Sequence, residues 1–313
     1  MDPLRLLTAE HGFFTRQEAL SAGYSERDVA RMVRNGTWLR FRRGYYAFPD
    51  EWNSLGAVGR HRVRSNAVLR SMGAAVALSH QSGAVRHDID VWGLDLSRVH
   101  VTRLDGGPGR IEGDVVHHEG LALDDDVVEV AGQLVLRAER CVIEAASRAN
   151  NEVALALFDS GLRARRYDCD LLTAQFATME HWPFIRHLHI PIRMADPLSG
   201  SVGESRGMWN FFQLGIPAPE KQHEVRDHDG RLVGVTDWHW ARFKQLGEFD
   251  GEVKYGRLLR PGQDPGEVVF EEKKREDLLR EITGCGMFRL TWADYDNPRR
   301  ILARFNRVTG RAG

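Results

Sequence analysis

The sequence has few cysteines and no long apolar segment. Only three of the 313 residues are cysteines, Cys141, Cys169 and Cys285, and no two of them form a CxxC pair. This spacing argues against a zinc ribbon or a disulfide framework and fits a reducing compartment. No run of about 18 apolar residues is present, so we expect no membrane-spanning helix. The opening residues, MDPLRLLTAEHG, lack the basic leader and apolar stretch of a signal peptide, and we expect a cytoplasmic protein.

The sequence also lacks nucleotide-binding motifs and an excess of positive charge. Neither GxxxxGKS nor GxGxxG occurs, so nothing indicates a nucleotide cofactor such as ATP or NAD. Lys and Arg number 43 against 44 Asp and Glu, for a formal net charge of −1. The chain is therefore not a polycation, and a nucleic-acid-binding surface must be a local patch. The length allows two or three domains.

The first 50 residues contain two clear helix starts and then a hairpin. Thr15 is followed by Glu18 and Ser25 by Asp28, each at the three-residue spacing of a capping box. TWLRFRRGYYAF alternates polar and aromatic residues around an Arg-Gly turn, which predicts a β-hairpin. With a leading helix, the order helix, helix, helix, hairpin is typical of a winged helix-turn-helix.

A basic patch coincides with these elements. Between residues 27 and 43 there are six arginines and one acid, the arginines being Arg27, Arg31, Arg34, Arg40, Arg42 and Arg43. The first three follow helical spacing opposite the apolar stripe, the next two should share a strand face, and the last lies at the hairpin tip. Guanidinium groups so placed could contact guanine edges and phosphates of double-stranded DNA, which predicts a nucleoid-associated protein. The alternative is a solvated basic face.

Two segments resemble a known family. FFTRQEALSAGYSERDVARMVRNGTWLRFRRGYYAFP resembles the N-terminal winged-helix domain of AbiEi-family antitoxins, which belong to bacterial abortive-infection toxin–antitoxin systems. ALSHQSGAVRHDIDVWG resembles the segment that follows in larger relatives. The resemblance implies operator binding, autoregulation and a cognate toxin as partner.

Residues 51–195 form a predicted mixed α/β middle region. A helix is expected over residues 61–80, followed by short strands and by a helix pair within residues 138–166. His80 and the pair His117-His118 suggest metal ligands, but no partner spacing supports a site, and core or surface histidines are expected. Cys141 is expected to be a small core residue.

Residues 196–313 begin with a polar linker that contains Pro197, Ser199, Gly200 and Ser201, and from residue 202 they read as α-β-β-β-α-β-α, a small α/β domain. Asp237 ends one expected strand and Glu248 lies in the next. Mg²⁺ binds to carboxylates that converge from rigid elements, and these two acids are candidate metal ligands. Glu204 could supply a third ligand, and Lys254 could steady the charge of a phosphodiester transition state. The alternative is an acidic hairpin with an Asp250-Gly251 turn.

This domain resembles the PD-(D/E)XK nucleases, and within them the very-short-patch-repair-like endonucleases. The matching residues are Glu204 in GESRGMW, Gln222 in EKQHEV, Asp237 in GVTDWHW, Glu248 with Asp250 and Gly251 in GEFDG, and Trp292 in FRLTWADY. The superfamily places lysine two positions after the second acid, where this sequence has Asp250. Either Lys254 substitutes, or Glu252-Val253-Lys254 is the motif, or the site is inactive.

The sequence therefore supports two hypotheses for an α/β multidomain protein with domains at residues 1–50, 51–195 and 196–313. The first is a DNA-binding protein of toxin–antitoxin or phage-defence type with a Mg²⁺-dependent endonuclease domain. The second is a non-enzymatic AbiEi-type antitoxin and transcriptional repressor with an inactive nuclease fold.

Overall fold

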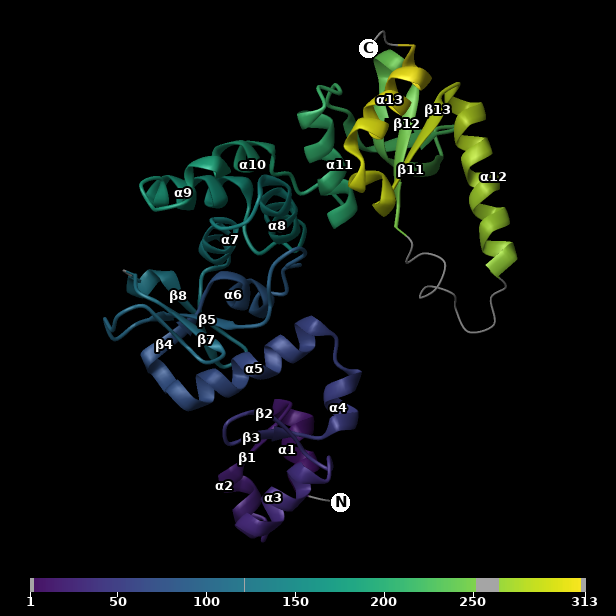
Figure 1. The fold of residues 1–313 in the computed structure, drawn as a ribbon. Helices are drawn as coiled ribbons and strands as arrows, with labels where there is room; N and C mark the ends of the chain where they lie inside the picture. Colours follow the sequence, from purple (N-terminus) through teal and green to yellow (C-terminus); the bar gives the residue numbers. More distant parts are fainter. Residues whose placement is uncertain (1–2, 121, 252–264, 311–313) are drawn as a thin grey trace. The chain divides into compact units, whose positions relative to one another are not determined.

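The computed structural model describes residues 3–120, 122–251 and 265–310 (Figure 1). The protein is a mixed α/β chain with two compact units, one of residues 1–148 and 174–183 and the other of residues 149–173 and 184–313. The second unit thus includes residues 149–173 and 184–195, although the sequence places them in the middle region. Across the described residues, no helix has the length and apolar character needed to cross a membrane.

The first unit begins with a module of three helices and a three-stranded antiparallel sheet of order β1-β3-β2. Its elements are α1 (Pro3–His11), β1 (Phe14–Thr15), α2 (Arg16–Ser21), α3 (Glu26–Arg34), β2 (Leu39–Arg42) and β3 (Tyr45–Ala47). Both predicted capping boxes are confirmed, at Thr15–Glu18 and at Ser25–Asp28. The predicted hairpin is confirmed as well. Gly44 sits in its turn with φ +78°, a conformation that glycine adopts without strain.

A register shift in the hairpin corrects one prediction. Arg40 pairs with Tyr46 and Arg42 with Tyr45, so one residue of β2 is left unpaired between them. Tyr45 and Tyr46 are neighbours in β3, so their side chains point to opposite faces of the sheet. Arg42 and Arg40, which pair with them, therefore point to opposite faces as well. The prediction that Arg40 and Arg42 share a strand face is therefore wrong, because it assumed a regular strand without a bulge.

The rest of the first unit is built on a six-stranded mixed sheet of order β6-β7-β5-β4-β9-β8. Its elements are α4 (Pro49–Ser54), α5 (Ala57–Met72), β4 (Val76–Leu78), α6 (His80–Arg86), β5 (Val99–Arg103), β6 (Arg110–Glu112), β7 (Val115–His118), β8 (Val127–Val130), β9 (Gln133–Leu136) and α7 (Ala138–Ala146). The helix predicted through residue 80 ends at Met72 instead. Gly73 turns the chain with φ +58°, and the next apolar residues form the buried central strand β4.

The second unit holds a four-stranded sheet of order β10-β11-β12-β13, in which only the last pair is parallel. Its elements are α8 (Asn151–Arg163), α10 (His189–Met194), α11 (Val202–Gln213), β10 (Glu220–Arg226), β11 (Leu232–Trp240), β12 (Gln245–Asp250), α12 (Pro265–Thr283), β13 (Gly286–Thr291) and α13 (Pro298–Thr309), while α9 (Cys169–Met179) is divided between the units. From α11 onward, the predicted order α-β-β-β-α-β-α is confirmed.

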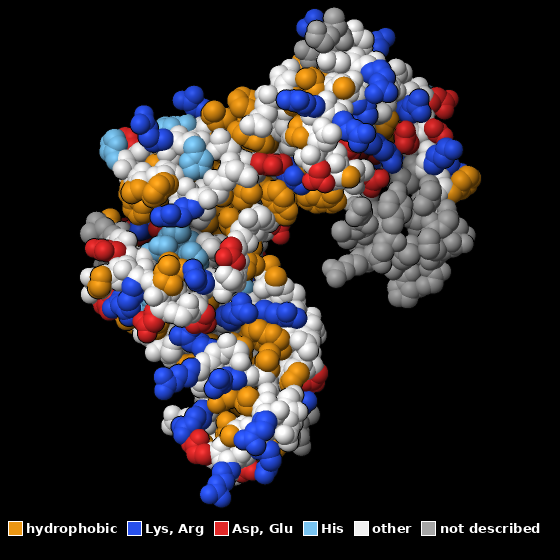
Figure 2. Space-filling model, viewed as in Figure 1, with side chains coloured by type: hydrophobic (Ala, Val, Ile, Leu, Met, Phe, Trp, Pro, Cys, Tyr) orange, Lys and Arg blue, Asp and Glu red, His pale blue; other side chains and the backbone are white. Residues whose placement is uncertain are grey.

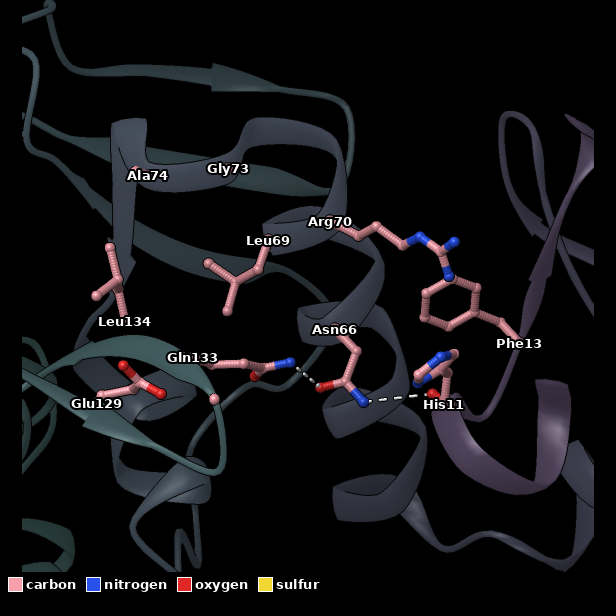
Figure 3. Close-up of a pocket in the computed structure, with 11 residues that line it drawn as sticks. His11, Phe13, Asn66, Leu69, Arg70, Gly73, Ala74, Glu129, Gln133 and Leu134 are labelled. Atoms are coloured by element: carbon pink, nitrogen blue, oxygen red, sulfur yellow. Dashed lines mark hydrogen bonds between the residues drawn. The ribbon is translucent and has the colours of Figure 1, made fainter. Parts of the chain in front are cut away.

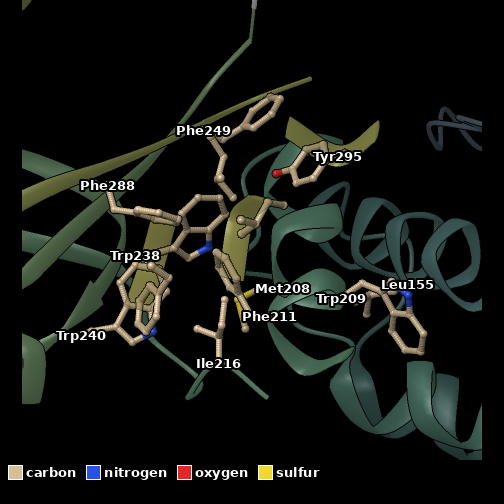
Figure 4. Close-up of a cluster of buried hydrophobic side chains, with 13 residues drawn as sticks. Leu155, Met208, Trp209, Phe211, Ile216, Trp238, Trp240, Phe249, Phe288 and Tyr295 are labelled. Carbon is tan, nitrogen blue, oxygen red and sulfur yellow. The ribbon is translucent and has the colours of Figure 1, made fainter. Parts of the chain in front are cut away.

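An aromatic core joins α11 to this sheet (Figure 4). Phe211 lies edge-on against Trp238 and Trp240, with ring centroids 5.0 and 5.1 Å apart. Gly203 lets the helix approach β12, since a Cβ there would lie 2.0 Å from the Phe249 ring. The close approach places the start of α11 beside the middle of the sheet.

A buried carboxyl group should make the second unit sensitive to pH. Asp159 of α8 is fully buried, accepts a hydrogen bond from the Asp196 amide at 2.8 Å, and has its pKa raised by burial to about 6. In the unfolded chain Asp159 loses its proton near pH 3.8. The stabilisation that the protonated carboxyl gives the folded state is therefore complete below that pH and is lost as the pH rises through 6. We expect a loss of about 2 kcal/mol in unfolding free energy between pH 4 and pH 8.

Urea unfolding at several pH values tests this expectation. Asp159→Asn keeps an acceptor for the amide without a charge, so it should remove most of the pH step. Asp170→Asn, at an exposed position, should leave the step as in the wild type. An unchanged pH profile in Asp159→Asn would contradict the assignment.

Candidate functional sites

Helix α3 presents a basic face to solvent. Its apolar residues Val29, Met32 and Val33 pack on the core of the N-terminal module. The opposite face exposes Arg27, Arg31 and Arg34. Figure 2 shows Lys and Arg side chains gathered over these N-terminal helices at the bottom of the view.

The hairpin carries two further exposed arginines, Arg40 and Arg43. Arg31 forms an ion pair with Asp28, whereas the other four exposed arginines have no acidic group within 4 Å among the described residues. Arg42 differs, since it is half-buried and ion-paired with Asp114 of the larger sheet. We therefore define the basic face by five residues, Arg27, Arg31, Arg34, Arg40 and Arg43.

The predicted acids of the second unit occupy distinct environments. Glu204 is buried in the first turn of α11, where its carboxylate accepts hydrogen bonds from the Gly200 amide at 2.8 Å and from Gln222 Nε2 at 2.9 Å. Asp237 lies against β12, and its Oδ2 accepts the Phe249 N–H at 2.7 Å. The structure thus brings Asp237 to the strand that carries Glu248.

Glu248 itself is held by arginines. One carboxylate oxygen, Oε1, lies 2.6 Å from a guanidinium nitrogen of Arg275 on α12. The other, Oε2, lies 3.3 Å from a guanidinium nitrogen of Arg289 on β13. Arg289 also lies 3.9 Å from the Asp250 carboxylate. An ion at Glu248 would have to compete with these guanidinium groups. Lys254, with the rest of Glu252-Val253-Lys254, lies outside the described residues.

Two groups of potential metal ligands occur among the described residues, and neither includes Glu204, Asp237 or Glu248. One is His80 with His100 and His118, and the other is Glu220 with His223 and His239; within each, the ligand atoms lie within 4.8 Å of one another. The sequence suggests His80 and His118 as possible metal ligands but gives no sign of His100. Twenty and eighteen residues separate the three in the chain, and no local spacing signals that they meet.

The pocket in Figure 3 lies between the N-terminal module and the larger sheet of the first unit. It encloses about 480 Å³ and includes Asn66, which donates to the His11 carbonyl at 3.3 Å and accepts from Gln133 at 3.1 Å. Arg70 pairs with Glu18 across its rim. These polar groups join the module to α5 and β9, so the pocket is a structural junction.

Comparison with known proteins identifies the N-terminal module. Residues 1–49 match the family model described as "Transcriptional regulator, AbiEi antitoxin". No curated protein matches the chain. The match covers the three helices and the hairpin that carry the basic face, and it makes this part of the chain AbiEi-antitoxin-like.

Proposed function

We propose that the protein is a DNA-binding transcriptional regulator of the AbiEi antitoxin type and that its N-terminal module is a winged helix-turn-helix. The observation that carries the proposal is the exposed basic face of α3 and the hairpin, within the segment that matches the antitoxin family model. In a winged helix-turn-helix, α3 would enter the major groove and the hairpin would contact the neighbouring backbone.

The arrangement of the five arginines suits this docking. Arg27, Arg31 and Arg34 recur once per helical turn, so their side chains reach along one groove. Arg43 at the hairpin tip would meet phosphates. Arg42 stabilises the module against the larger sheet through Asp114 and is not assigned to the interface. A cognate toxin is the protein partner that an antitoxin would bind.

The double variant Arg27→Ala/Arg34→Ala tests DNA binding. Each phosphate contact contributes about 0.9 to the slope of log K against log salt, so two lost contacts should lower the slope by about 2 and weaken binding at low salt by at least tenfold. Fluorescence anisotropy with double-stranded DNA from the region upstream of the protein's own gene measures both. The matched control, Arg110→Ala/Arg137→Ala, removes two exposed arginines elsewhere in the unit and should leave the slope unchanged. Equal slopes in both variants would contradict the docking.

For the second unit we propose a PD-(D/E)XK-like domain. The order α11-β10-β11-β12 and the position of Asp237 against the strand of Glu248 favour this assignment. Mg²⁺-dependent hydrolysis of a DNA phosphodiester is the second candidate function, with Asp237 and Glu248 as ligands and Glu204 and Lys254 in support. The described residues do not fit a ready Mg²⁺ site, because Arg275 and Arg289 hold Glu248. A regulator with a nuclease-like scaffold is therefore the leading proposal.

Calorimetric titration with Mg²⁺, which prefers oxygen ligands, in the presence of DNA separates the two candidates. For the leading proposal we expect no binding by the wild type, because two guanidinium groups compete with the ion. Binding that is present in the wild type and lost in Asp237→Ala would instead support the endonuclease. Asp227→Ala, at a turn of the same unit, is the control for an unspecific loss of charge.

A further inference from the structure

Three histidines from separate elements meet on the first unit. His80 begins α6, His100 lies in β5 and His118 ends β7. His100 Nδ1 is 2.9 Å from His118 Nε2, and the His80 ring stacks on that of His118 with centroids 3.6 Å apart. One nitrogen of each ring lies within 4.8 Å of the others, and all three side chains are half-buried. Figure 2 shows histidine side chains gathered on the visible face of this unit.

A hydrogen-bond chain keeps two of these imidazoles neutral. Gln81 Nε2 can only donate, so His100 Nε2, at 2.9 Å, accepts. The proton of neutral His100 is then on Nδ1 and is donated to His118 Nε2. Neutral imidazole is the form that binds metal ions.

A buried carboxylate and a serine hydroxyl flank the third imidazole. Glu144 Oε2 accepts the His80 backbone N–H at 3.3 Å and lies 3.2 Å from His80 Nδ1, and Arg140 donates to the other oxygen at 2.9 Å. The hydrogen-bond partner of His80 Nδ1 is Ser79 Oγ at 3.1 Å, and with the ring proton on Nδ1, His80 Nε2 keeps its lone pair for another partner. His80 also has φ +49°, a strained backbone conformation that the surrounding structure maintains.

We propose that His80, His100 and His118 form a binding site for a divalent transition-metal ion such as Zn²⁺. Imidazole suits Zn²⁺, Co²⁺ and Ni²⁺, and three imidazoles leave one tetrahedral position for water or another ligand. Zn–N bonds of about 2.0–2.1 Å place tetrahedral ligand nitrogens roughly 3.4 Å apart. The ion therefore replaces the proton between His100 and His118 and separates them by a few tenths of an ångström. The His80 ring tilts out of its stack. The proton of His100 moves to Nε2, and the Gln81 amide gives up its bond to the Asp95 carbonyl and turns so that its oxygen accepts the new Nε2–H.

The second group of ligands, Glu220 with His223 and His239, is the internal competitor. There the carboxylate is exposed, and one oxygen already lies 2.9 and 3.2 Å from the two Nδ1 atoms. That group is a surface cluster in which the acid bridges the rings directly. In the first group Glu144 bridges no two rings, and His100 Nδ1 and His118 Nε2 face one another directly.

The experiment is titration of the metal-free full-length protein with Zn²⁺ by calorimetry and with Co²⁺ by visible absorption. We expect one tight equivalent and the intense bands of tetrahedral Co²⁺ with nitrogen ligands. His118→Gln and His100→Gln should abolish that equivalent. Ser79→Ala should weaken it by about 10–100-fold, as is typical when the group hydrogen-bonded to the other nitrogen of a ligand histidine is removed.

Two controls make the result specific. His117→Gln changes the adjacent residue of β7, whose side chain is buried and outside the group, and should retain the equivalent. His239→Gln disables the competing cluster and should also retain the tight Zn²⁺ equivalent. Near-ultraviolet circular dichroism reports whether each variant folds. If His118→Gln or His100→Gln does not fold, His80→Gln takes its place as the variant that removes a ligand. Zn²⁺ binding unchanged in His118→Gln and His80→Gln, or lost only in His239→Gln, would overturn the proposal.

Discussion

Replacing Phe211 by alanine should lower the unfolding free energy of the second unit by about 3–5 kcal/mol, the range for truncating a fully buried phenylalanine. The Phe211 side chain is 1% exposed and fills the space between α11 and the rings of Trp238 and Trp240. Alanine would leave a cavity that rigid indole rings cannot close. Urea denaturation, followed by tryptophan fluorescence, measures the change.

The adjacent residue gives a matched control. Phe212 is 51% exposed, so Phe212→Ala removes the same atoms from a position that is largely in water. We expect a loss below about 1 kcal/mol there. Equal losses in the two variants would mean that α11 does not present its Phe211 face to the sheet. Because the chain has two compact units, the fluorescence curve should be fitted with two transitions.

Replacing Arg140 by methionine should destabilise the first unit by about 3–5 kcal/mol, because it leaves a buried acid without its partner. Arg140 is 3% exposed and donates to Glu144 at 2.9 Å and to Asp126 at 2.6 Å. Burial raises the pKa of Glu144, and Arg140 opposes that rise. Without Arg140 the pKa rises further, so the loss should be larger at pH 8 than at pH 5, where Glu144 can take up a proton.

Two companion variants test this reasoning. Arg137→Met alters an arginine just before the same helix whose side chain is 49% exposed, and it should change the unfolding free energy by less than about 0.5 kcal/mol. Arg140→Met/Glu144→Gln removes both charges and should recover part of the stability at pH 8. A double variant no more stable than Arg140→Met would show that packing of the arginine side chain, rather than its charge, is what matters.

Much of the fold follows from local patterns. The capping boxes at Thr15 and Ser25, the hairpin around Gly44 and the element order after residue 196 depend on residues a few positions apart, and the structure has them where the sequence predicts. The bulge between Arg40 and Arg42 is one exception, and the helix predicted through residue 80 is another. An apolar run such as Val76–Leu78 suits a buried strand or a helix, and only pairing with β5 and β9 decides between them.

The sequence by itself determined the helix starts, the turns and the basic face of α3, because capping, glycine conformations and helical spacing act within one or two turns of the chain. Only the tertiary structure decided that Arg42 pairs with Asp114, 72 residues away, that Glu248 is held by Arg275 and Arg289, and that His80, His100 and His118 meet. Those contacts depend on a bulge in β2, on the packing of α12 and on strand pairing. Each is set by burial of distant segments against one another, which no local spacing records.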